Sequence, residues 1–175
     1  SEIINIFKPY LNIKELKMAK NGGPGLARQH GVDNSNGEYI VFIDADDYFY
    51  GPEAIIKMYD KMKENDLDLL ISNFRYERNN EIEIKKQNPV WLHGKMYKRK
   101  FLTDNKIKFN STRANEDNGF NRLILLMNPK LDYLDEITYV YSENEESITR
   151  KNNCEYRFTG LEWFVYNMKW AMEQA

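Results

Sequence analysis

The sequence lacks a cysteine framework and long apolar runs. Its single cysteine, Cys154, excludes an intramolecular disulfide and suits a reducing compartment. No run approaches the roughly 18 apolar residues of a membrane-spanning helix, and no signal peptide leads the chain. We therefore expect a cytoplasmic location, with any membrane association peripheral to the inner face of the membrane.

Neither sign of charge is in large excess. The chain has 25 Lys and Arg against 27 Asp and Glu, a formal net charge of -2, and a sequence pI near 5.8. The two signs are interspersed, without a polybasic block. Because nucleic-acid binding depends on clustered positive charge, we expect no nucleic-acid partner.

The composition is that of a globular domain rich in rings. The 175 residues suffice for one domain with a core, and 42% of them are hydrophobic. Aromatic residues make up 14%, including 12 Tyr, which is more than a minimal core requires. Open sugar-binding clefts use such rings, but ordinary cores use them too. The aromatic content alone is therefore only suggestive of a carbohydrate ligand.

The stretch at residues 39–49, Y-I-V-F-I-D-A-D-D-Y-F, organises the chain. Its apolar start does not alternate with polar residues, which predicts a strand at 39–43 buried on both faces of a largely parallel sheet. Asp44, Asp46 and Asp47 follow at once, and like charges this close favour a divalent cation with oxygen ligands. The alternative is that these aspartates only cap and solvate the following turn.

Periodicity predicts alternating helices and strands, an α/β fold with ligands outside the carboxyl ends of the strands. We expect helices at residues 1–8, 24–34, 52–62, 98–104, 116–127 and 155–172, strands at 13–19, 39–43, 67–72 and 131–141, and a hairpin at 74–84.

Three helices carry stripes that we expect to be buried. Small residues at i, i+4 and i+8 would let the second helix lie close to the sheet. The three stripes are Gly23, Ala27 and Gly31; Ile55, Ile56, Tyr59 and Met62; and Phe158, Leu161, Val165, Met168 and Met172.

Five ordered blocks resemble family 2 glycosyltransferases of the GT-A fold. N-G-G-P-G-L-A-R-Q-H-G at 21–31 and G-E-Y-I-V-F-I-D-A-D-D at 37–47 look like the central signature of that family. W-L-H-G-K-M-Y-K-R-K-F-L at 91–102, N-E-D-N-G-F at 115–120 and E-E-S-I-T-R at 145–150 are similar to its later blocks. The resemblance implies a Rossmann-like mixed sheet flanked by helices. Residues 1–150 would form a partial GT-A domain, with a C-terminal helix in 151–175 packing on the same domain.

The resemblance also implies a metal-dependent donor site. In such enzymes the D-x-D pair holds Mn²⁺ or Mg²⁺ on the diphosphate of a nucleotide sugar. Asp46 matches the direct metal ligand, and Asp44 the residue that touches the ribose or a metal-bound water. Asp47 is either a ligand or the start of the turn.

The resemblance assigns the acceptor chemistry to an acidic pair. Asp117 matches the base that deprotonates the acceptor hydroxyl during inverting transfer. Glu116 would lie on the acceptor side. The alternative is that both acids only stabilise the helix dipole in a first turn, a role that fits Glu116 better.

Further site residues also come from the resemblance. Arg28 would contact the nucleotide or pin the loop around the aspartates. Lys95 would steady a phosphate, and Arg150 would complement the donor phosphates. Trp91 would stack on an acceptor sugar, although a core role fits it nearly as well. His93 could reach the metal, but a lone loop histidine is weak evidence for that.

Family members usually begin with a strand, a helix and a second strand that ends in an aspartate-rich turn, which binds the base and ribose, and this chain begins after that point. The resemblance therefore implies that the isolated chain binds nucleotide poorly and is a weak or inactive transferase. We therefore expect an open apolar sheet edge at residues 39–43. Either the chain is a fragment, or other sequence completes the sheet, or a second copy pairs with it in a homo-oligomer.

Three functions stay open from the sequence. The first is a glycosyltransferase that moves sugar from a nucleoside-diphosphate donor to a saccharide, lipid or protein hydroxyl. The second is an inactive or incomplete relative that binds carbohydrate or serves as an assembly module. The third is a phosphatase of the haloacid-dehalogenase type, which leaves the Asn-Gly-Gly block at 21–23 without a role.

Overall fold

A six-stranded mixed sheet forms the centre of the molecule. The computed structural model describes residues 2–142, 144 and 154–175. The strand order is β1-β5-β3-β6-β2, and β4 pairs with β3 off this path. The pair β3 and β6 is parallel, while the other pairs are antiparallel. The strands are β1 (Tyr39–Ile40), β2 (Tyr48–Phe49), β3 (Leu69–Arg78), β4 (Glu81–Lys85), β5 (Lys95–Lys98) and β6 (Leu131–Tyr141).

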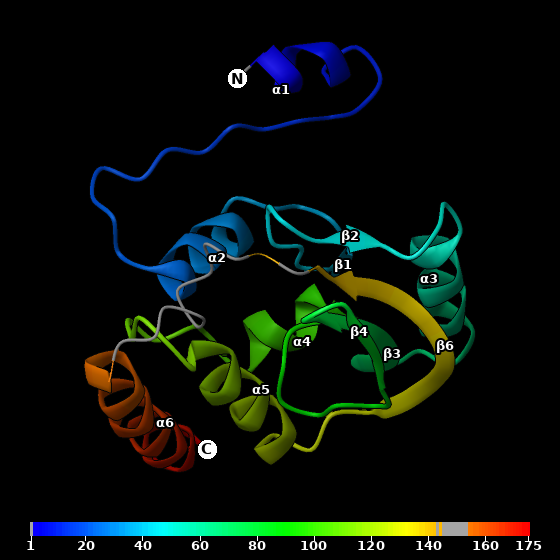
Figure 1. Ribbon diagram of the computed structural model, residues 1–175. Helices are drawn as coiled ribbons and strands as arrows, with labels where there is room; N and C mark the ends of the chain where they lie inside the picture. Colours follow the sequence, from blue (N-terminus) through cyan, green and yellow to red (C-terminus); the bar gives the residue numbers. More distant parts are fainter. Residues whose placement is uncertain (1, 143, 145–153) are drawn as a thin grey trace.

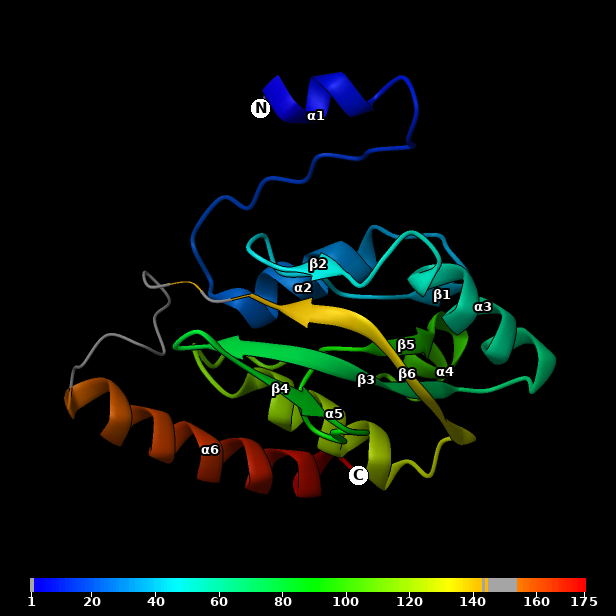
Figure 2. The ribbon, with the colours of Figure 1, turned by 45° about the vertical axis from the view of Figure 1, so that its right-hand side comes forward.

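The chain has six described helices, and all of them except α1 pack against the sheet or against one another (Figure 1). They are α1 (Glu2–Phe7), α2 (Pro24–Asp33), α3 (Ala54–Glu64), α4 (Arg99–Asp104), α5 (Glu116–Leu126) and α6 (Cys154–Gln174). Because side chains alternate along β3, Leu69 joins a core with Phe120 of α5, while Leu70 joins a second core with Met58 and Met62 of α3. Helices α5 and α6 run side by side (Figures 1 and 2). No helix of the described part is both long and apolar enough to cross a bilayer.

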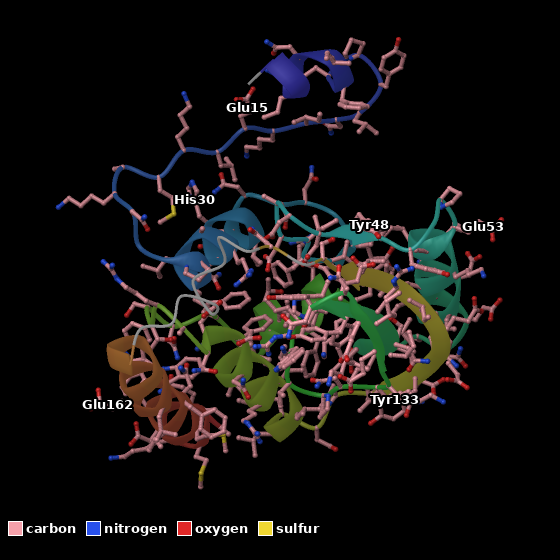
Figure 3. All side chains as sticks on the ribbon, viewed as in Figure 1. Glu15, His30, Tyr48, Glu53, Tyr133 and Glu162 are labelled. Atoms are coloured by element: carbon pink, nitrogen blue, oxygen red, sulfur yellow. The ribbon has the colours of Figure 1, made fainter. Side chains whose placement is uncertain are left out.

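The segment before α2 lies apart from the body of the molecule (Figures 1 and 2). Helix α1 confirms the predicted first helix. The strand predicted at residues 13–19 is wrong, because no described residue pairs with this segment to complete its backbone hydrogen bonds. Leu16 and Met18 are 37% and 39% exposed, and Glu15 lies well away from the sheet (Figure 3).

The strand predicted at residues 39–43 is shorter and less covered than expected. Only Tyr39 and Ile40 are in β1, which pairs antiparallel with β5 at one end of the strand order. Ile43 is 47% exposed. The expected burial on both faces of a parallel sheet is therefore wrong. The expected open edge is confirmed for the described residues, because β1 has a strand on one side only.

The predicted helix stripes agree with the packing only in part: Met62 of α3 is buried as expected and Ile55 packs against the same core, while other predicted members are exposed. In α2 the buried residues are Gly25 and Gln29. In α3 they are Ala54, Met58 and Met62, and in the described part of α6 they include Asn167 and Ala171. Predicted stripe residues that are instead exposed are Ala27, Gly31, Ile56, Tyr59, Leu161, Val165 and Met172. Phe158 lies outside the residues whose side chains the structure describes. The β3–β4 hairpin, α4, α5 and β6 confirm the predicted elements.

Candidate functional site

The carboxylate loop that follows β1 is held by the end of β6. Asp47 accepts hydrogen bonds from the Tyr139 hydroxyl (2.5 Å) and the Ser142 backbone N–H (2.9 Å). The backbone N–H of Asp44 donates to the same Tyr139 oxygen (3.3 Å), and the amide of Asn144 donates to Asp46 (2.7 Å). Burial raises the pKa of Asp47 to about 6, against the opposing effect of the bond from Tyr139. These bonds tie the loop to β6 and to the residues that follow it.

His93 faces this loop from an aromatic cluster. Its Nε2 atom lies 3.9 Å from Oδ2 of Asp47. Asp44, Asp47 and His93 each offer a ligand atom, and these atoms all lie within 4.8 Å of one another. Burial lowers the pKa of His93 to about 4, so the ring is neutral at pH 7 and keeps a lone pair. Nδ1 is buried and has no hydrogen-bond partner among the described residues.

Arg28 of α2 joins the carboxylate loop to the first turn of α5. Its guanidinium donates to Asp44 (2.6 Å) and to Glu116 (2.5 Å). The Arg28 side chain is 17% exposed and that of Glu116 is 7% exposed. The two carboxylates raise the pKa of Arg28 although burial opposes this shift. The bridge therefore brings into contact three segments that are far apart in the sequence.

Asp117 lies next to this bridge in the first turn of α5. The turn begins after Asn115, whose φ of 57° is left-handed. The Asp117 carboxylate accepts a hydrogen bond from the backbone N–H of Asn118 (2.8 Å). Burial, and then the charge of Glu116, raises the pKa of Asp117 to about 6. A carboxyl group with this pKa can exchange a proton near neutral pH.

Lys95 and Trp91 lie close to the same site. Lys95 is 2% exposed, and its ammonium donates to the carbonyls of Asn88 (2.6 Å) and Trp91. Burial lowers the pKa of Lys95 to about 7. These contacts fix the turn that carries Trp91, and the expected contact of Lys95 with phosphate stays a prediction. Arg150 and most of its block at 145–150 fall outside the described residues.

Comparison with known proteins identifies the family. Residues 2–115 match the family model described as glycosyl transferase family 2. The chain belongs to this family. The matched range includes both the Asn-Gly-Gly block and the three aspartates, so the phosphatase interpretation is set aside.

Two curated relatives are longer than this chain. The chain is 30% identical over 157 residues to the poly(ribitol-phosphate) beta-glucosyltransferase of Bacillus spizizenii. This alignment covers 80% of this chain and 25% of that protein. The chain is 25% identical to the poly(ribitol-phosphate) beta-N-acetylglucosaminyltransferase TarP of Staphylococcus aureus, over 89% of this chain and 55% of TarP. The chain thus spans a quarter to about half of the length of these relatives.

A solved structure shows the same fold as this chain. Residues 1–349 of S. aureus TarS, in complex with UDP-GlcNAc, align with a TM-score of 0.78 and 20% identity. The alignment covers 99% of this chain and 53% of that one. This likeness confirms the predicted GT-A fold.

The structure brings together four of the residues expected from the family 2 resemblance, Arg28, Asp44, Glu116 and Asp117. Tyr139 was not among the candidate site residues, although it bonds both Asp47 and Asp44. The alternation of tyrosines in β6 is a signal for a strand face. It gives no sign that one ring reaches the carboxylate loop.

Proposed function

We propose that this chain carries the transfer site of a metal-dependent, inverting glycosyltransferase. It would move a sugar from a nucleoside-diphosphate donor to the hydroxyl of a saccharide, lipid or protein. The bridge from Arg28 to Asp44 and Glu116 is the observation that supports this proposal most strongly, because it joins the carboxylate loop to the helix of Asp117. A sugar-nucleotide donor is supported by the solved structures of TarS, which were determined in complex with UDP-GlcNAc and with UDP.

The side chains around the carboxylate loop offer ligand atoms that fit a divalent cation. Asp44, Asp47 and His93 offer two carboxylates and an imidazole whose Nε2 atom lies 3.9 Å from Asp47, and Mn²⁺ accepts both ligand types. Asp46, held by Asn144, adds a carboxylate to the same loop. Mg²⁺ would rely on the carboxylates alone. A bound cation would neutralise negative charge on the diphosphate as it leaves.

Asp117 is our proposed general base. The acceptor O–H proton would pass to its carboxylate while the acceptor oxygen bonds to the anomeric carbon. The bond from that carbon to the diphosphate oxygen breaks, and its electron pair stays on the oxygen. A single displacement of this kind inverts the anomeric configuration. A raised pKa of about 6 makes the carboxylate a better base than an exposed aspartate.

Thermal stability in the presence of Mn²⁺ and UDP tests the donor site, when it is measured on a chain extended at its N-terminus with the strand–helix–strand segment that such enzymes usually carry. We expect UDP to raise the melting temperature when Mn²⁺ is present and much less without it, because a ligand that binds only the folded state stabilises it. Asp46→Asn and Asp47→Asn should each reduce this shift. Asp104→Asn, at an exposed carboxylate on α4, is the matched control and should keep it. A melting temperature that does not respond to UDP and Mn²⁺ together would contradict the proposal.

A further inference from the structure

A groove lies beside the candidate site, between the β3–β4 hairpin and Trp91. It has a volume of about 340 Å³, and its lining includes Tyr76, Arg78, Glu83 and Lys85. Strand β3 pairs with β5 up to Ile71 and with β4 from Phe74 onward. Trp91 belongs to the connection between β4 and β5. The groove therefore lies where these two neighbours of β3 diverge.

Register places most of the lining on one face of the sheet. Tyr76 and Arg78 are two residues apart on β3, so they point to the same side. Their cross-strand partners on β4 are Glu83 and Glu81, and the partner of Tyr76 on β6 is Tyr141. Paired residues on neighbouring strands share a face. The hairpin thus presents one continuous surface rather than scattered side chains.

Aromatic rings form the base of this surface. The ring of Tyr76 stacks on Tyr141 with centroids 5.1 Å apart and an interplanar angle of 24°, and it lies 6.0 Å from the ring of Trp91. The rings continue to the candidate site, because His93 lies 4.9 Å from Tyr141 and 5.9 Å from Trp91. His93 in turn lies 3.9 Å from Asp47 of the carboxylate loop, so only this ring cluster separates a ligand in the groove from the loop.

The rim is polar and balanced in charge. Arg78 and Lys85 provide two positive groups, and Glu81 and Glu83 provide two negative ones. Lys85 pairs with Glu83 at 2.6 Å. Such a rim offers donors and acceptors for hydroxyl groups without a net field that attracts a polyanion. The hairpin itself is tight, since both residues of its turn, Asn79 and Asn80, have positive φ angles of 52° and 59°.

We propose that this groove binds a neutral oligosaccharide, as a subsite for the part of the acceptor remote from the reacting hydroxyl. The apolar faces of the sugar rings pack against Trp91 and against Tyr76, where they take the place of the Lys85 ammonium that lies 5.4 Å from the centroid of the Tyr76 ring. The rim hydrogen-bonds the sugar hydroxyls. Binding of the oligosaccharide follows from the groove alone. Its role as acceptor rests on the proposed glycosyl transfer.

Calorimetric titration of the chain with cellotetraose, chitotetraose and maltotetraose tests the groove. At least one of these neutral probes should bind. Tyr76→Leu keeps an apolar side chain but loses the ring, so the affinity should fall about tenfold, whereas Tyr76→Phe should stay within about twofold of wild type. Glu83→Gln, at a side chain 60% exposed, leaves the core intact and should also weaken binding.

Ile82→Thr is the matched control, because Ile82 lies on the opposite face of β4 and is 61% exposed. It should bind the probe as wild type does. The inference is overturned if no neutral probe binds, if Tyr76→Leu and Glu83→Gln both bind like wild type, or if oligo(ribitol phosphate) binds more tightly than every neutral probe. Probe binding without any response to UDP and Mn²⁺ would support the groove and contradict the proposed transfer; the reverse pattern would contradict the groove alone.

Discussion

Removing the guanidinium of Arg28 should destabilise the fold far more than breaking an exposed ion pair. Arg28→Met keeps most of the aliphatic chain but leaves Glu116, whose side chain is 7% exposed, without its cationic partner. Breaking a buried pair costs about 3 to 5 kcal/mol. Asp44 is 38% exposed and regains water, which reduces the loss. We therefore expect the free energy of unfolding to fall by about 2 to 4 kcal/mol.

A double-mutant cycle with Glu116→Gln isolates the bridge. The single change leaves Arg28 bonded to Asp44, so it should cost about 1 to 2 kcal/mol. In the double variant no unpaired carboxylate remains at residue 116, and the loss should be smaller than the sum of the two single losses by about 1 to 3 kcal/mol.

Urea unfolding followed by circular dichroism measures these losses. Lys57→Met is the control, because it breaks the Lys57–Glu136 pair, whose side chains are 44% and 48% exposed. Its cost should stay below about 1 kcal/mol. The reasoning is refuted if Arg28→Met costs no more than this control, or if the losses of the Arg28 and Glu116 variants simply add.

Three further predictions use the same geometry. Gly25→Ala should lower the free energy of unfolding by about 1 to 3 kcal/mol, because a Cβ there would lie 2.7 Å from the Asn110 carbonyl oxygen. Gly31 has open space around it, so Gly31→Ala should raise the free energy of unfolding by up to about 1 kcal/mol. Equal effects of the two variants in urea unfolding would contradict this prediction. Tyr139→Phe removes the hydrogen bond to Asp47, so the pKa of Asp47 should rise further and calorimetry should show weaker Mn²⁺ binding at neutral pH; unchanged affinity would count against the site. The rate of transfer should fall as the pH falls through about 6, because Asp117 becomes protonated. Stability has the opposite dependence: the pKa of Asp117 is raised on folding, so the stability that the protonated group contributes at acid pH is lost as the pH rises through about 6. Asp117→Asn should remove that loss, so unfolding curves at pH 8 should show a more stable variant.

Elements with strong local patterns were predictable from the sequence. Helix α5 follows its apolar periodicity, and the hairpin follows the alternation on either side of its turn. The strand predicted at residues 13–19 failed because alternation describes a strand face but supplies no neighbour. The stripe of α6 failed because its packing depends on Asn167, which is fully buried and bonds Thr112 and Asn110. A Cβ at Gly119 would lie 2.5 Å from Oδ1 of Asn167, so that glycine makes the contact possible.

The candidate site was predictable only where the family resemblance carried it. The blocks around Arg28, Asp44 and Glu116 follow one another in the sequence, and the structure joins those three residues directly. Tyr139 could not be inferred in the same way. Its contact with Asp47 depends on the pairing of β2 with β6, a register between segments about 90 residues apart that no local pattern specifies.

The proposed transfer is tested by measuring the release of UDP from UDP-GlcNAc by the same N-terminally extended chain, in the presence of Mn²⁺ and an acceptor oligosaccharide. The account predicts that UDP release requires the cation, falls by about two to four orders of magnitude in Asp117→Asn, and yields a product of inverted anomeric configuration. UDP binding to Asp117→Asn should persist, since the change leaves Asp44, Asp46 and Asp47 in place. UDP release that is independent of Mn²⁺, or that Asp117→Asn leaves unchanged, would contradict the account.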